Sequence, residues 1–175
     1  RALDLPEDRA VFLLASTGHR RKGLARLADV FARTSLPATR VVAGRAPDGA
    51  LPSNVRYLGY RADLENVYRA VDCTVMASAY EPFGLVGVES GLCGTAVLLA
   101  DNVGCAEVIG KAARTGFALQ DGASLEHALD TVVQRWRAGA HRVARPLEAL
   151  AYDPAVGVHV EALLAIVRRL VAERA

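Results

Sequence analysis

The segment AVFLLASTGHRRKGLARLADVF, residues 10–31, contains the pattern that decides the fold. It begins with an apolar run of strand length at residues 10–15. Apolar residues then recur at i, i+3, i+4 and i+7, at Leu24, Leu27, Ala28 and Phe31. This spacing puts them on one face of a helix, so the segment predicts a buried strand, a short cationic loop and an amphipathic helix.

The same unit recurs along the chain. Apolar runs of strand length follow at residues 39–43, 55–58, 73–77 and 96–100, and a shorter run at residues 117–119 brings the set to about six strands. Helical patterns separate most of them, and Asp63 and Ser124 stand where N-caps belong. Strands that are apolar throughout need cover on both sides. We therefore predict a Rossmann-like α/β fold, a doubly wound parallel sheet with helices on both faces.

Two further segments are assigned from their turn and cap residues. A loop is expected after the second strand, at Pro47, Asp48, Gly49 and Pro52. Asp153 and Pro154 form an N-cap and first-turn pair for a last helix. The apolar stripe of that helix is expected to face the core through Val160, Leu163, Leu164, Val167 and Val171.

The composition is that of one folded domain. The 175 residues carry 21 Lys and Arg against 19 Asp and Glu, and the acidic residues are scattered among the basic ones. Without a basic stripe, nucleic acid is not an expected partner. Three cysteines without C-x-x-C spacing support neither a zinc site nor a disulfide framework. No apolar run approaches the ~18–20 residues that span a bilayer, so we expect a cytoplasmic protein.

The loop after the first strand, Ser16 to Gly23, is the first candidate site. It contains Arg21 and Lys22 and leads directly into a helix, whose N-terminus carries a positive partial charge. Cations beside a helix N-terminus are typical of an anion site. Taken alone, the segment is explained equally well by an exposed basic turn.

The loop after the fourth strand, SAYEPFGLVGVE at residues 78–89, is more informative. It places two carboxylates, Glu81 and Glu89, eight residues apart, with Gly84 between them near the start of a helix. A carboxylate among apolar neighbours needs a hydrogen-bonding partner, and the diol of a ribose or a sugar would provide one. Glycine at position 84 would let a diphosphate approach backbone N–H groups, because it has no Cβ.

These residues resemble a known family. EPFGLVGVE, residues 81–89, followed by SGLCGTAV, residues 90–97, is similar to the E-x7-E segment of retaining GT-B glycosyltransferases of family 4. RKG at residues 21–23, NVRYLGY at 54–60 and VDCTVMAS at 71–78 fall in the family's order. The resemblance implies the C-terminal, donor-binding half of a GT-B fold, in which a nucleotide sugar lies between two Rossmann-like halves. RKG and YRADL, residues 60–64, look most like the lipopolysaccharide core glucosyltransferase branch.

The resemblance also implies roles for individual residues. Arg21 and Lys22 would hold the diphosphate, and Glu89 would bind the ribose hydroxyls. Glu81, as the catalytic residue, would bind hydroxyls of the transferred sugar. The second carboxylate is usually followed by Ala, and Ser90 follows it here, a small exchange that is expected to have no consequence.

Other positions complete the donor site that the resemblance implies. Backbone N–H groups would come from the start of the helix, at Gly84, Leu85 and Val86. Arg61 would stack on or border the base, because a guanidinium plane lies well on an aromatic ring, and Tyr60 is the alternative stacking residue. At Ser16 and Thr17 the chain departs from most of the family, which has an arginine there. Phosphate binding would therefore rest on the two loop cations.

The sequence as a whole thus predicts the donor-binding half of a retaining glycosyltransferase. It would transfer a hexose from a nucleoside diphosphate sugar, with a UDP-sugar favoured, to a glycan or lipopolysaccharide-type acceptor. Cations and a helix N-terminus would stabilise the diphosphate, so no metal and no cofactor are expected. Residues 1–175 open at Arg1 without an initiator Met, and we expect one domain of a longer protein. Its partner would be an N-terminal acceptor domain, the fragment alone would transfer nothing, and the full-length protein would be a candidate for peripheral contact with the inner face of the cell membrane.

Two alternatives remain open at this stage. One is an epimerase or a phosphorylase of the same architecture. A phosphorylase is expected to anchor a cofactor on a lysine, and only Lys22 and Lys111 are available. The other alternative is a non-catalytic nucleotide-sugar-binding module that keeps the fold without turnover. A second Rossmann-like half upstream of Arg1 would favour the enzyme.

Overall fold

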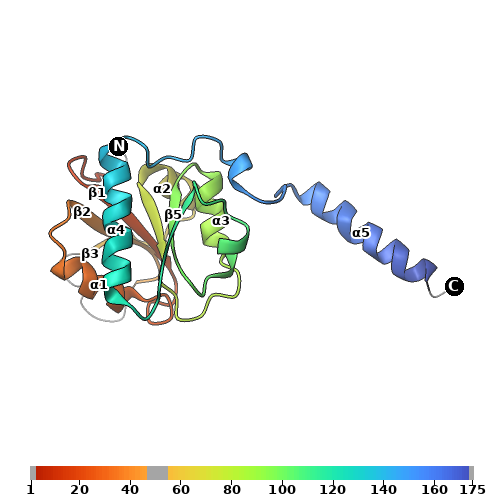
Figure 1. The fold of residues 1–175 in the computed structure, drawn as a ribbon, viewed down its shortest axis with the longest axis horizontal. Coiled ribbons are helices and arrows are strands. Elements are labelled where there is room, and N and C mark those ends of the chain that lie inside the picture. Colours follow the sequence, from red (N-terminus) through yellow and green to blue (C-terminus); the bar gives the residue numbers. More distant parts are fainter. Residues whose placement is uncertain (1–2, 47–54, 174–175) are drawn as a thin grey trace.

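The computed structural model describes residues 3–46 and 55–173. The loop expected at Pro47 to Pro52 lies outside these residues. The elements follow in the order β1 (Ala10–Ser16), α1 (Leu24–Arg33), β2 (Ala38–Gly44), β3 (Val55–Tyr57), α2 (Leu64–Ala70), β4 (Cys73–Met76), α3 (Leu85–Leu92), β5 (Ala96–Ala100), η1 (Gly104–Glu107), β6 (Arg114–Phe117), α4 (Gly122–Arg137), η2 (Leu147–Ala149) and α5 (Val156–Ala172). Figure 1 shows a layered α/β body from which the last helix, α5, projects.

Six strands form one sheet in the order β3-β2-β1-β4-β5-β6, and every neighbouring pair is parallel. The chain winds outward from β1 to β3, returns to the middle of the sheet at β4, beside β1, and winds outward again to β6. The predicted doubly wound, Rossmann-like sheet is confirmed. At the β1–β4 junction, where Phe12 pairs with Cys73, the strand order reverses. Sheets of this kind bind ligands in the crevice beyond the carboxyl ends of the strands at such a point.

The side chains of β1 alternate between the two faces of the sheet. Phe12 and Leu14 belong to the larger core, which includes the buried faces of α1 and α4, whereas Val11 and Leu13 belong to a second core with α2. All four side chains are at most 2% exposed. Figure 1 shows α4 lying across the near face of the sheet. Because both faces are covered, the strands are continuous apolar runs, and this is why the sequence pattern located them.

A buried polar cluster joins α3 and α2 to the sheet. The hydroxyl oxygens of Ser90 and Thr74 lie 2.7 Å apart, and Ser90 Oγ also lies 3.1 Å from the carbonyl oxygen of Thr95. Thr95 Oγ1 donates to the carbonyl oxygen of Tyr68 at 2.6 Å. The three hydroxyl residues are fully buried, so Ser90 has a structural role here that the sequence did not reveal.

Three element boundaries differ from the sequence prediction by more than one residue. α5 begins at Val156 with Ala155 as its N-cap, so Asp153 and Pro154 precede the helix, and Asp153 Oδ1 accepts from the amide of Ala155 at 2.9 Å. The sixth strand is β6 at Arg114–Phe117 instead of residues 117–119, because backbone pairing with β5, and not apolar content, sets this edge strand. α4 begins at Gly122, and its N-cap is Asp121, whose Oδ1 accepts from the amide of Ala123 at 2.9 Å. Ser124 instead accepts from the amide of Ala118 at 2.9 Å.

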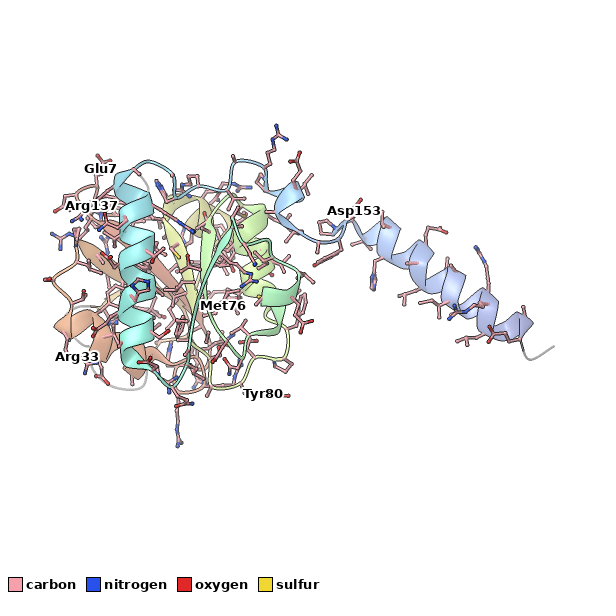
Figure 2. The ribbon with its side chains drawn as sticks, in the orientation of Figure 1. Glu7, Arg33, Met76, Tyr80, Arg137 and Asp153 are labelled. Carbon is pink, nitrogen blue, oxygen red and sulfur yellow. The ribbon has the colours of Figure 1, made fainter. Side chains whose placement is uncertain are left out.

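The last helix forms, but the prediction that its apolar stripe packs against the core is wrong. α5 has no buried residue, and the stripe expected to face the core is exposed, with Leu163 at 49% and Leu164 at 40%. Figure 1 shows α5 standing away from the sheet, and Figure 2 shows its side chains projecting from the helix on all sides. An apolar stripe shows that one face of a helix suits burial, but it does not say against which surface. Among the described residues, no helix is long and apolar enough to cross a membrane.

Removal of residues 155–175 should leave the melting temperature of the remaining chain unchanged, because α5 contributes no buried side chain. Removal of residues 144–175 is the matched comparison in the same calorimetric scan. It also deletes Leu150, which is 9% exposed, and the bond from the Gly110 amide to the Ala149 carbonyl at 2.7 Å. The leucine alone is worth about 1.5–3 kcal/mol, which lowers the melting temperature by several degrees. Equal melting temperatures after both truncations would contradict this account.

Candidate functional site

A cavity of about 320 Å³ opens at the carboxyl ends of β1 and β2, where Ser16 and Gly44 contribute to its wall. Five of the residues singled out in the sequence line this cavity: Arg21, Lys22, Tyr60, Arg61 and Val86. The first two follow β1, the next two follow β3, and Val86 lies in the first turn of α3. The winding of the sheet therefore brings three distant segments of the chain to one place.

An ion-paired cluster spans the crevice between the loops that follow β1 and β4. Glu81 Oε2 pairs with Lys22 Nζ, lies 3.3 Å from Arg21 Nη1, and accepts from Ser78 Oγ at 3.0 Å. The side chains of Lys22 and Glu81 are each only 12% exposed. Burial acts to raise the pKa of Glu81, but the hydrogen bond and charge of Lys22 outweigh it, so this pKa is lowered. Both candidate phosphate-binding cations are thus held by one carboxylate.

Hydrogen bonds fasten the two loops to each other. The amide of Ala79 donates to the carbonyl of Arg21 at 2.8 Å, and Arg21 Nη1 donates to the carbonyl of Tyr80 at 2.8 Å. Asn102 Nδ2 donates to the carbonyls of Ser78 and Ala79, both at 3.0 Å. The positions of the cationic turn and of the acidic loop are therefore set together.

Glycine is required before α1 and before α3 because both positions have a left-handed backbone, and at Gly23 also because the backbone of Ala77 lies close. Gly84 has φ of 95°, and a Cβ there would lie 2.6 Å from Met76 Cε. Gly23 has φ of 77°, and a Cβ there would lie 2.3 Å from the carbonyl oxygen of Ala77. Both glycines let a helix start close to the end of β4. The left-handed backbone at position 84 therefore explains Gly84 without reference to a ligand.

The two helix N-termini differ in what they offer an anion. Ahead of α1, the amides of Lys22, Gly23 and Leu24 are already bonded to carbonyls of the same turn, at 3.0–3.3 Å. The amides of Leu85 and Val86, in the first turn of α3, have no carbonyl within the helix to bind, as at any helix start. The α3 terminus can therefore donate backbone hydrogen bonds, whereas the turn before α1 contributes mainly its side chains.

Glu89 occupies the second turn of α3, on the same face as Val86. The sequence indicated a carboxylate among apolar neighbours, but the structure leaves Glu89 exposed. Tyr68 Oη donates to Glu89 Oε2 at 3.0 Å. Burial, followed by the charge of Glu89, raises the pKa of Tyr68. The hydrogen-bond partner of Glu89 is thus a buried tyrosine on α2, which no sequence motif had indicated.

The loop after β3 presents a fixed guanidinium and a free aromatic ring. Arg61 forms two hydrogen bonds with the carboxylate of Asp63, at 2.9 and 2.7 Å, whereas Tyr60 is 76% exposed. Ser16 was noted in the sequence only as a departure from the family. Ser16 lines the cavity, and its buried Oγ has no hydrogen-bond partner within the described part of the chain. Residues 3–46 and 55–173 contain no group of three His, Cys, Asp or Glu placed to hold a metal ion.

Residues 1–143 match the family model of glycosyl transferases group 1. The chain therefore belongs to this glycosyltransferase family. A protein from Burkholderia thailandensis named as a probable transglycosylase is 44% identical over 162 residues, which cover 91% of this chain and 44% of that protein. The chain thus spans less than half the length of this relative.

Two solved structures have the same fold in part of their length. Anabaena HepE, in complex with UDP and glucose, aligns with a TM-score of 0.72 and 23% identity over 93% of this chain and 48% of its own. WaaG, described as a glycosyltransferase involved in lipopolysaccharide biosynthesis, aligns with a TM-score of 0.60 and 23% identity over 78% of this chain and 42% of its own. At these identities the likeness establishes the fold alone.

The substitution Glu81→Gln should lower the melting temperature at pH 7, because it removes a charge-assisted contact worth about 1.5–3 kcal/mol. The folded-state pKa of Glu81 is below its usual value of 4.5, so the pair stabilises the protein fully above that pH. The stabilisation is lost as the pH falls through the lowered pKa. Thermal melts from pH 7 to pH 3 should show the two proteins converging, whereas the exposed substitution Glu161→Gln should have little effect. A difference that does not depend on pH would contradict this assignment.

Proposed function

We propose that this chain is the donor-binding half of a retaining GT-B glycosyltransferase of family 4, and that its cavity holds a nucleoside diphosphate sugar. The observation that carries the proposal is the convergence of Arg21 and Lys22 with Glu81 across the strand-order reversal, beside a cavity that Val86 of α3 also lines. Family membership supports glycosyl transfer. UDP is favoured as the nucleotide because HepE was solved with UDP and glucose.

In this proposal the cationic cluster binds the diphosphate. Two cations and one carboxylate leave a net positive charge, and the first-turn amides of α3 add hydrogen-bond donors. Negative charge grows on the diphosphate as its bond to the sugar breaks. Lys22 and Arg21 would stabilise that charge, since the loop bonds already hold them in place. The proposed mechanism therefore needs no divalent metal.

Glu81 would contact the transferred sugar through its second oxygen. Its partners in the described chain all bind Oε2. Oε1 would accept from sugar hydroxyls, in keeping with the catalytic role that the family resemblance implies. The same side chain would thus hold the phosphate-binding cations and orient the sugar.

Arg61 and Tyr60 are proposed to border the base. The bidentate bond to Asp63 fixes the guanidinium plane of Arg61 at the cavity wall. The exposed ring of Tyr60 is the second stacking surface. Both lie in the loop after β3. This strand is at the edge of the sheet, and β2 and β1 separate it from β4.

The acceptor is proposed to be a glycan or a lipopolysaccharide-type molecule, in the cytoplasm or at the inner face of the membrane. The RKG and YRADL segments support the lipopolysaccharide core branch, and WaaG, which shares the fold, has a role of this kind. An N-terminal half would bind the acceptor, and the 44% coverage of the Burkholderia relative leaves room for such a half.

Calorimetric titration should show that the 175-residue chain binds UDP more tightly than ADP or GDP, and that EDTA leaves the affinity unchanged. Lys22→Ala should weaken UDP binding about tenfold or more, because it removes a charge-assisted contact to the diphosphate. Glu89→Ala should weaken it about three- to tenfold through the ribose. The control Glu161→Ala, on α5, should bind as the unaltered chain does. Undetectable UDP binding, or an affinity that EDTA abolishes, would refute the proposed site.

The full-length protein, which includes the upstream region, should transfer hexose with retention of anomeric configuration. Proton NMR of the product distinguishes the two anomers directly. The isolated chain should show no transfer. An inverted product would refute the retaining mechanism, and absence of turnover by the full-length protein with all tested acceptors would favour the non-catalytic binding module.

A further inference from the structure

Side chains on the facing surfaces of α2 and α3 lie in successive pairs, starting at the cavity and continuing along the two helices. Leu64 of α2 and Val86 of α3 both line the cavity. One turn farther along each helix, Tyr68 and Glu89 meet in a hydrogen bond of 3.0 Å. A helical turn rises about 5.4 Å, so the carboxylate of Glu89 lies within reach of a ligand that fills the cavity.

Tyr68 is held more firmly than the carboxylate that it contacts. Its side chain is 1% exposed and belongs to the core between α2 and the sheet. Its carbonyl accepts from the buried hydroxyl of Thr95 at 2.6 Å. Glu89 is exposed, and a free glutamate side chain on a helix surface samples several rotamers. The rigid phenol therefore restricts the mobile carboxylate, and not the reverse.

The geometry of the bond selects one oxygen of the carboxylate. Tyr68 Oη donates to Oε2, which leaves Oε1 and the remaining lone pair of Oε2 as acceptors. Two vicinal hydroxyl groups need two acceptor positions at a fixed separation and orientation. A carboxylate whose rotation is restrained on one side supplies such a pair at a smaller entropic cost than a freely rotating one.

We propose that Tyr68 is a positioning residue for the donor nucleotide, which fixes the carboxylate of Glu89 in the orientation that receives the two ribose hydroxyls. This inference rests on the proposed function. It assigns Tyr68 no contact with the nucleotide. It predicts instead that the phenol contributes to affinity only for ligands that carry the ribose diol.

The test is calorimetric titration of the 175-residue chain and of Tyr68→Phe with UDP and with 2′,3′-dideoxy-UDP. Tyr68→Phe should bind UDP about three- to tenfold more weakly, the range expected for one hydrogen bond. Its affinity for the dideoxy nucleotide should match that of the unaltered chain. In a Glu89→Ala background, Tyr68→Phe should have no further effect on UDP binding. Tyr152→Phe, an exposed tyrosine outside the cavity wall, is the matched control.

The outcomes separate this inference from the function on which it rests. An equal loss of affinity for both nucleotides would show a merely structural role for Tyr68 and would overturn the inference. Unchanged UDP binding by Tyr68→Phe would overturn it as well, while the donor site would stand. Failure of the unaltered chain to bind UDP would overturn the proposed function and the inference together. Thermal melts of Tyr68→Phe check its folding. If that variant is destabilised, the comparison is repeated between Glu89→Ala and the double variant Glu89→Ala/Tyr68→Phe.

Discussion

The ion pair between Lys22 and Glu81 links the two halves of the sheet where the strand order reverses. β1 is followed by a loop that carries the cation, and β4 is followed by a loop that carries the acid. Parallel pairing of these strands, with Phe12 beside Cys73, brings their carboxyl ends together. The other contacts between these two loops depend on this meeting, because the bond between Ala79 and Arg21 forms only when the loops are adjacent.

Burial strengthens the electrostatic interaction of this ion pair. Both side chains are 12% exposed, so the charges are screened less than those of an exposed pair. The same burial would be unfavourable for either ion alone. The pair therefore holds the two loops together. It also leaves a net positive charge, since Arg21 and Lys22 share the single carboxylate of Glu81. This combination holds the two cations of the loop after β1 in place.

A second set of polar contacts joins α3 and α2 to the sheet. Ser90, Thr74 and Thr95 are fully buried and bonded to one another or to neighbouring carbonyls. Satisfied buried polar groups have directional requirements that apolar packing lacks, so they fix how α3 lies against β4 and α2. The orientation of Glu89 toward Tyr68 follows from that arrangement. The packing of the core thus determines the geometry of the candidate ribose site.

The strand and helix pattern, the α/β class and the family could be predicted from the sequence, because continuous apolar runs and the EPFGLVGVE segment are local signals. The sequence also placed Arg21, Lys22 and Glu81 in loops that a doubly wound sheet must bring to one edge. Three features could be known only from the folded molecule: Glu81 holds both cations, Tyr68 contacts Glu89, and α5 leaves its apolar stripe exposed. Those outcomes depend on which surfaces meet across long separations, and periodicity along a chain reports only which face of an element suits burial.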